Sequence, residues 1–164
     1  MRSMQISGLD ELDEQLTLAG NAAQGIAKAS LYEGANIMAN AIHSGLDRIQ
    51  TEPWRYATDS DKRLPSPEEK AAILSAKFGV AKHEGSGAEV NTVVGLTGSG
   101  YVELQGKSGS RRVAAALLLR SIQSGTSFMK AQPIVRRAVN GAKGAATAKI
   151  AAEGEARLNK IFND

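Results

Sequence analysis

The segment from Ser127 to Lys130 reads S-x-x-K, a spacing in which a lysine one helical turn away can activate a serine nucleophile. Lys107 to Gly109 matches in part the K-T-G element that accompanies S-x-x-K in penicillin-recognising enzymes. In those enzymes the S-x-x-K comes first, an S-D-N element lies between the two, and the domain is much larger. Because the order is reversed here, we expect no serine active site.

Phosphate and metal sites find little support in the sequence. Gly106 to Ser108 looks like the end of a phosphate-binding loop, but that motif needs a glycine five residues earlier, where Tyr101 stands. His43 and His83 are the only histidines, and neither has an Asp, Glu or His at a spacing that makes a convincing metal site. The absence of cysteine excludes disulfides, thiolate–zinc sites and a cysteine nucleophile. We therefore expect no catalytic residue, metal, cofactor or enzymatic activity.

Charge divides the chain into two unlike parts. Residues 1–106 carry nine Lys and Arg against fourteen Asp and Glu, a net charge of −5, whereas residues 107–164 carry eleven against three, a net charge of +8. This asymmetry suits either a nucleic-acid surface or copies of one protein that meet head to tail, acidic face on basic face.

Two clusters carry much of this charge. An acidic cluster stands at a predicted helix start, where the helix dipole favours carboxylates, and a solvated helix face explains it better than acid–base catalysis does. It comprises Asp10, Glu11, Asp13 and Glu14. The basic cluster is the best candidate for contact with nucleic-acid phosphates, although its members do not gather on one face of a helical wheel. It comprises Arg136, Arg137, Lys143, Lys149, Arg157 and Lys160.

Two long helices and their connections must position these residues within a single domain, residues 1–164. A short helix is expected from Leu9 to Leu18, ended by Gly20 and Asn21, and a long Ala-rich helix from Gln24 to Ile49. The apolar stripe of the long helix has a mean spacing of about 3.67 residues, which fits a straight helix. Its members are Ala27, Leu31, Ala35, Met38, Ile42, Leu46 and Ile49. A polar surface loop is predicted at about residues 50–64.

The middle of the chain contains turn and strand signals. Ser66 to Glu69 is a capping box with proline at the first helical position, and it predicts a short helix that ends at Gly79. The alternation that follows predicts an antiparallel hairpin from strands 80–84 and 90–94, with a third strand at 101–104. That third strand lies within a Gly-rich loop at about residues 95–110.

The last third predicts two more helices. The most apolar segment of the chain forms a helix from Arg111 to Gln123 that Gly125 ends, and Pro133 begins a final helix of up to 30 residues. We expect this final helix to pack along the helix of residues 24–49. The fold class is therefore α+β: two long Ala-rich helices and two shorter helices packed with a small antiparallel sheet.

Two segments resemble a phage family. Ile6 to Leu12, followed by a long Ala-rich helix, is similar to the start of the neck and tail-completion proteins of long-tailed siphophages. Arg120 to Val139 resembles the family's pattern of a Gly-Thr turn, Ala-Gln-Pro, an apolar residue and an Arg followed by Ala two positions later. The chain departs from that pattern at Ile134, where Phe is common, and at Arg137, where Pro is common.

The resemblance implies a virion protein that forms a ring in the neck, between the portal-side connector and the tail tube. A hexamer is our first expectation and a dodecamer the second, with head-completion and tail-terminator or tail-tube proteins as neighbours and non-specific DNA contact in the channel. The expected locations are the virion and, during assembly, the host cytoplasm. The candidates for subunit contact lie in and after the Gly-Thr turn: Gly125, Thr126, Phe128, Met129, Gln132, Pro133, Arg136 and Arg137.

The competing hypothesis is a small basic DNA-binding protein. Neither hypothesis includes a membrane. The longest strongly apolar run, Val113 to Leu119, is far shorter than the ~20 residues that cross a bilayer. The N-terminal residues turn acidic where a secretory signal has its apolar stretch, so we expect no such signal.

Overall fold

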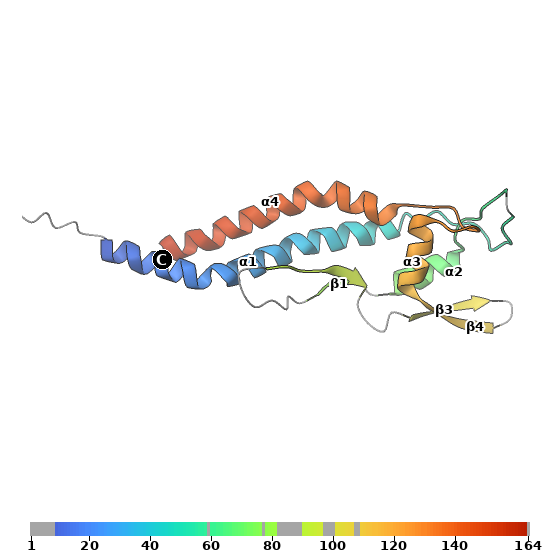
Figure 1. The fold of residues 1–164 in the computed structure, drawn as a ribbon, viewed down its shortest axis with the longest axis horizontal. Coiled ribbons are helices and arrows are strands. Elements are labelled where there is room, and N and C mark those ends of the chain that lie inside the picture. The colour runs from blue at the N-terminus through green and yellow to red at the C-terminus, as the bar shows by residue number, and fades with distance from the viewer. Residues whose placement is uncertain are drawn as a thin grey trace, which may run out of the picture.

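The molecule is a long helical stalk with a small head at one end (Figure 1). The computed structural model describes residues 9–58, 60–76, 78–81, 90–96, 101–106 and 109–163. The stalk consists of α1 (Leu9–Leu46) and α4 (Ile134–Asn163). The head consists of α2 (Pro67–Ser75), α3 (Ala115–Ser124), the hairpin of β3 (Tyr101–Gly106) and β4 (Gly109–Ala114), and the segments 47–66 and 125–133. The fold is α+β with two long helices, as predicted.

The first helix is longer than expected. The prediction of two helices separated at Gly20 and Asn21 was wrong, because α1 is continuous over 38 residues and roughly 57 Å. A helix interior tolerates glycine at a cost of about 1 kcal/mol relative to alanine, which the good helix formers on both sides offset. The final helix has the predicted length of 30 residues and begins after Pro133.

Small residues bring the two stalk helices together, which confirms their predicted packing. A Cβ added to Gly34 would lie 2.6 Å from Ile150 Cδ1 and 3.1 Å from the Ala146 carbonyl oxygen. At the head end, a Cβ on Gly45 would lie 3.0 Å from Ile134 Cγ2. Residue numbers rise along α1 as they fall along α4, so the helices are antiparallel.

The strands form two separate hairpins in place of one sheet. β1 (Phe78–Val80) pairs antiparallel with β2 (Val94–Leu96), and β3 (Tyr101–Gly106) pairs antiparallel with β4 (Gly109–Ala114). The first hairpin lies along α1. Its strands share only Val80 and Val94 with the predicted strands 80–84 and 90–94, and residues 82–84 of that prediction fall outside the described residues. β3 confirms the predicted third strand.

The start of α3 corrects a second prediction. The segment 111–114, expected to be helical, is the end of β4, where Val113 lies opposite Val102 and Arg112 opposite Glu103. Pairing with β3 supplies backbone hydrogen bonds to this segment, so the helix begins only at Ala115. It ends where predicted, because Gly125 has a φ of 73°, a left-handed conformation that residues with a Cβ rarely adopt.

The hydrophobic core lies in the head and at the adjoining end of α1. Its buried members come from α1, α2, α3, β3 and the segments 47–66 and 125–133. They are Ile42, Leu46, Ile49, Ala72, Ile73, Leu104, Ala115, Leu118, Ile122 and Met129. Farther along the stalk the buried side chains are small, among them Ser30, Ala35 and Ala146. No helix in the described part of the chain is long and apolar enough to cross a membrane.

Candidate functional site

The segment between α3 and α4 contains most of the predicted contact residues, and its first half is a closed turn. The Thr126 hydroxyl oxygen accepts hydrogen bonds from the backbone N–H of Met129 at 3.0 Å and of Phe128 at 3.3 Å. The Thr126 N–H donates to the Met129 carbonyl oxygen at 2.9 Å. Gly125 and Thr126 therefore shape the turn itself.

Phe128 and Met129 point to opposite sides. Met129 is 1% exposed and belongs to the core, whereas Phe128 is 49% exposed. We correct the expectation that the Met129 side chain contacts a neighbouring subunit, because it fills the core of its own chain. Phe128 remains accessible to a neighbour.

Two backbone hydrogen bonds connect this turn to the segment at about residues 50–64, which was predicted to be a surface loop. The Arg63 N–H donates to the Phe128 carbonyl at 3.0 Å, and the Lys130 N–H donates to the Arg63 carbonyl at 2.9 Å. This two-bond pairing is parallel and sets the alternation that turns Met129 inward. The last part of the 50–64 segment is thus an internal part of the head.

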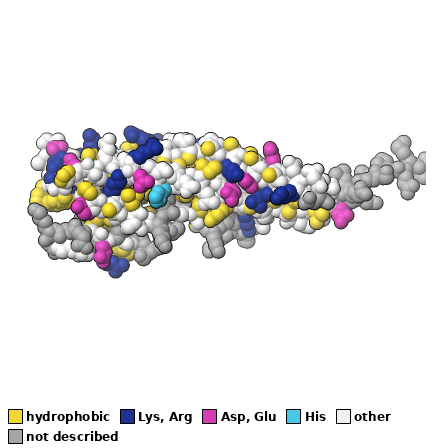
Figure 2. Space-filling view, turned by 180° about the vertical axis from the view of Figure 1, so that it is seen from behind, with side chains coloured by type: hydrophobic (Ala, Val, Ile, Leu, Met, Phe, Trp, Pro, Cys, Tyr) yellow, Lys and Arg dark blue, Asp and Glu magenta, His cyan; other side chains and the backbone are white. Residues whose placement is uncertain are grey.

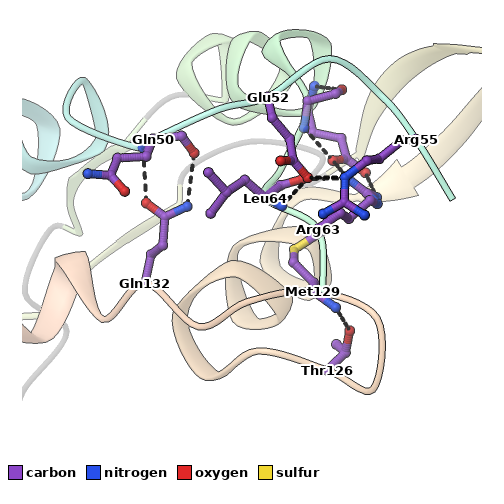
Figure 3. A network of polar contacts seen from close by, with 10 residues as sticks. Gln50, Glu52, Arg55, Arg63, Leu64, Thr126, Met129 and Gln132 are labelled. Atoms are coloured by element: carbon purple, nitrogen blue, oxygen red, sulfur yellow. Dashed lines mark hydrogen bonds and ion pairs between the residues drawn. The ribbon is translucent and has the colours of Figure 1, made fainter. Parts of the chain in front are cut away.

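The Arg63 side chain enters a buried ion pair. Its two terminal nitrogens donate to the two carboxylate oxygens of Glu69 at 2.7 Å each, and both side chains are 6% exposed (Figure 3). The hydrogen bonds that Arg63 donates to Glu69, together with the negative charge of Glu69, raise the pKa of Arg63, although burial acts in the opposite direction. The pair is doubly hydrogen-bonded and buried, so its role is structural.

The same glutamate completes the predicted capping box of α2. The Glu69 carboxylate accepts from the Ser66 N–H at 2.8 Å, and the Ser66 hydroxyl accepts from the Glu69 N–H at 3.2 Å. The motif therefore identified Glu69 and Ser66 from sequence. Arg63 was missed, because no short motif relates it to Glu69.

Gln132 connects the segment that precedes α4 to the segment that follows α1. Its side-chain oxygen accepts from the Gln50 N–H and its side-chain nitrogen donates to the Gln50 carbonyl, both at 2.9 Å (Figure 3). Two residues after Gln50, Glu52 accepts a hydrogen bond from the Leu64 N–H at 2.7 Å and forms an ion pair with Arg55, whose Nε lies 3.1 Å from Glu52 Oε1. Gln132, a predicted contact residue, is thus engaged within its own chain.

A groove of about 700 Å³ opens beside Gln132, where α1 meets the start of α4. Three basic side chains line it, Arg48, Lys130 and Arg137, together with the apolar Pro133 and Ile134. Of the predicted contact residues, Gln132, Pro133 and Arg137 line this groove. The described lining contains no Asp or Glu. Arg136 is exposed outside it.

Aromatic side chains lie on the surface of the molecule. Every Phe, Tyr and Trp side chain that the structure describes is between 40% and 83% exposed. They are Tyr32, Trp54, Tyr56, Tyr101, Phe128 and Phe162. The rings of Trp54 and Tyr56 contact each other edge to face at 4.6 Å, and Arg112 lies 5.1 Å from the centroid of Tyr101. The buried core is built from aliphatic residues and Met129.

The described residues form no catalytic constellation. Ser127 and Lys130, both described, share no hydrogen bond. His43 lies 3.8 Å from Asp47 one helical turn away, a pair that the sequence spacing contained and that we overlooked. No group of three metal-ligating side chains occurs in the parts of the chain that the structure describes.

Comparisons with known protein families, with curated proteins and with solved structures found no match.

Proposed function

We propose that this chain is a structural virion protein of a tailed phage that forms a ring in the neck, between the portal-side connector and the tail tube. The observation that carries this proposal is the exposure of all six described aromatic side chains. Aromatic residues supply much of the binding energy in protein interfaces and are usually well buried in a protein that acts alone. A surface that exposes them all is best explained by contacts with other chains.

The shape of the molecule supports the same proposal. A stalk of two helices offers long sides to neighbouring copies, and the head exposes Trp54, Tyr56 and Phe128 at one end. The sequence resemblance over Arg120 to Val139 is our reason for assigning these contacts to a phage neck. A closed ring uses heterologous interfaces, in which different patches of one subunit meet, and the opposite charge of the two halves suits such contacts.

A ring of six copies would match a tail tube, and a ring of twelve would match a portal. In either case the proposed neighbours are head-completion proteins on one side and tail-terminator or tail-tube proteins on the other. The protein would be found in the host cytoplasm before assembly and in the virion afterwards.

The test is to remove the gene from the phage that encodes it and to examine the particles by electron microscopy. The proposal predicts DNA-filled heads and separate, complete tails, and joining of the two when the chain is supplied from a plasmid. Normal, infectious particles without the chain would contradict it. A Ser127→Ala version should restore joining fully, since the proposal assigns no nucleophile.

DNA binding is the alternative proposal, favoured by the basic residues Lys143, Arg136 and Arg137, which form no ion pair with any residue that the structure describes. On the face shown in Figure 2, however, basic side chains are scattered among acidic and hydrophobic ones along the molecule and form no continuous patch. Binding through phosphates would fall steeply with salt, by a slope set by the number of contacts. Titration of duplex DNA at several salt concentrations separates the two proposals, because a neck ring needs no tight duplex binding by the isolated chain.

A further inference from the structure

The groove at the junction of α1 and α4 has the composition of a binding site for a carboxylate-bearing partner. Arg48, Lys130 and Arg137 line it, and none of them is in an ion pair with a described carboxylate. Guanidinium and ammonium groups are usually matched by anions when they converge on one concave site. The lining also includes the apolar Pro133 and Ile134 beside uncharged polar side chains such as Gln132, so a partner with both acidic and apolar side chains would fit.

The opposite end of the stalk carries a helix with that composition. Gly154 of α4 lies opposite Ser30, so the last described turns of α4 reach only to about residue 21 of α1. Residues 9–20 of α1, here called the arm, therefore extend beyond α4, as Figure 1 shows. The arm has no α4 residue to pack against.

Leu16 marks the apolar side of the arm. It lies 18 residues, or five full helical turns, before Gly34, so both are on the side of α1 that faces α4 along the stalk. Gly34 is covered by Ile150, whereas Leu16 is 55% exposed because α4 has ended. The packing face of α1 thus continues into the arm, where α4 no longer covers it within the described residues.

The acidic residues of the arm lie to one side of this face: around the helix, Asp13 is about 60° from Leu16 and Glu14 about 160°. Asp13 and Glu14 are exposed and make no ion pair with any described residue, and the sequence places Asp10 and Glu11 on the turn before them. The arm is therefore an amphipathic, acidic segment with an uncovered apolar stripe. Its charge is opposite to that of the groove.

The arm cannot reach the groove of its own chain. Asp13 and Ser44, which lines the groove, are both on the single helix α1, and 31 residues of helix separate them by roughly 46 Å. A contact between these two surfaces must therefore join two copies of the chain.

We propose that the acidic arm of one copy docks in the basic groove of the next copy, head to tail. Asp13, which shares a face of the arm with Leu16, pairs with Lys130 or Arg137 of the neighbour, and Leu16 covers the apolar lining. Glu14 adds its negative charge beside them. A groove of about 700 Å³ takes several side chains from one face of a helix and not a whole helix. The contact is heterologous, so repetition yields a ring or a filament. As a ring contact, it rests on the proposed neck function.

A disulfide test detects the contact even when it is weak. The chain has no cysteine, so Thr17→Cys in the arm and Ser44→Cys in the groove would be the only thiols of two separately purified full-length variants. Both residues are exposed, and both replacements are small. Under mild oxidation the two variants should form a heterodimer in preference to either homodimer.

The matched control replaces another exposed serine of the head, Ser124→Cys, which lies outside the groove lining. Thr17→Cys should link to Ser44→Cys at least about tenfold faster than to Ser124→Cys. Equal rates, or no linkage to Ser44→Cys, would overturn the proposal.

Charge reversal tests the ion pairs. The groove variant carries Lys130→Glu with Arg137→Glu, and the arm variant carries Asp13→Lys with Glu14→Lys. Each should slow Thr17–Ser44 disulfide formation by about tenfold or more, since like charges then face each other. When a chain with the groove reversal is mixed with a chain with the arm reversal, the rate of disulfide formation should be restored. Reversal at exposed lysines outside the groove, Lys62→Glu with Lys143→Glu, should leave the rate unchanged.

Two outcomes count against this contact specifically. Failure of the paired reversals to restore linkage would overturn it, as would groove reversal that abolishes duplex DNA binding while disulfide formation is unaffected. Neither outcome decides the neck proposal. If particles lacking the chain still show unjoined heads and tails, the ring role stands and another pair of surfaces forms the ring.

Discussion

The head and the stalk are stabilised by different kinds of contact. The head buries large aliphatic side chains and Met129, a doubly hydrogen-bonded Arg63–Glu69 pair and backbone bonds between segments far apart in the sequence. The stalk joins two helices through glycine, alanine and serine, and most of α4 beyond Ala146 is exposed.

This difference indicates a division of roles. Burial of large apolar side chains contributes most of the stability of a domain, so the head can fold around its own core. Small residues permit close helix contact but remove little apolar surface from water. The pairing of the stalk helices therefore depends on close packing at a few small residues. At the free end of the stalk, apolar surface stays exposed and is available to other chains.

The largest effect is expected in the head, at the buried ion pair. Glu69→Gln keeps an acceptor for the capping box but leaves the Arg63 charge buried without a carboxylate, which should cost about 3–5 kcal/mol of unfolding free energy. The measurement is urea denaturation followed by circular dichroism. The double variant Arg63→Met with Glu69→Gln should recover most of the loss. A single variant as stable as the wild type would show that the pair is not buried in solution.

Truncation of a core side chain should reduce the unfolding free energy nearly as much, whereas truncation in the arm should hardly change it. Ile73 is fully buried, and Ile73→Ala should cost about 2–5 kcal/mol by the same measurement. Leu16→Ala removes a leucine that is 55% exposed and should change stability by about 0.5 kcal/mol or less. Equal losses would mean that the arm packs within its own chain.

Smaller changes in stability are expected when glycines of the stalk are replaced by alanine, and the two replacements below should act in opposite directions. Gly34→Ala places a Cβ against Ile150 and should destabilise by about 1–3 kcal/mol. Gly144→Ala meets nothing within 4 Å and should stabilise by about 0.5–1 kcal/mol, because alanine favours the helix. Thermal melting of both variants is the check. Gly34→Ala combined with Ile150→Ala should lose less than Gly34→Ala alone, and an additive loss would argue against the close approach.

The smallest effect is expected at the surface of α4. The hydrogen bond from Lys149 at 2.7 Å and the positive charge of Lys149 lower the pKa of Glu153 below its ordinary value of 4.5. The pair therefore stabilises the fold above about pH 4.5, and this contribution is lost as the pH falls through the lowered pKa. Glu153→Gln should slightly reduce the melting difference between pH 7 and pH 3, and about 1 M salt should remove that change. A large change would indicate that Glu153 takes part in a buried ion pair like that of the head, which would contradict its partly exposed position on α4.

Local sequence signals predicted the parts of the fold that local physics decides. The Ser66–Glu69 capping box, the helix stop at Gly125 and the start of α4 at Pro133 all have motifs within a few residues, and all three were confirmed. The failures required information from far along the chain. The strand at 111–114 depends on β3, and the continuity of α1 through Gly20 has no local marker.

The candidate site shows the same limit. The sequence identified the segment 125–133 but not the direction of its side chains, since Met129 turns inward only because Arg63 pairs beside it. The groove was not predicted, because Arg48 and Arg137 are 89 positions apart and meet only when α1 and α4 pack.

Hydrogen exchange on the full chain, isolated and in purified particles, tests most directly the claim that this protein acts by contact between copies. In the isolated chain, amides of α2 and α3 should exchange only through global unfolding, and amides 13–20 should exchange rapidly. In particles, protection should rise at residues 13–20 and at the groove residues 130–137, while the head core stays as it was. Unchanged exchange in both segments, in particles that contain the chain, would contradict the account.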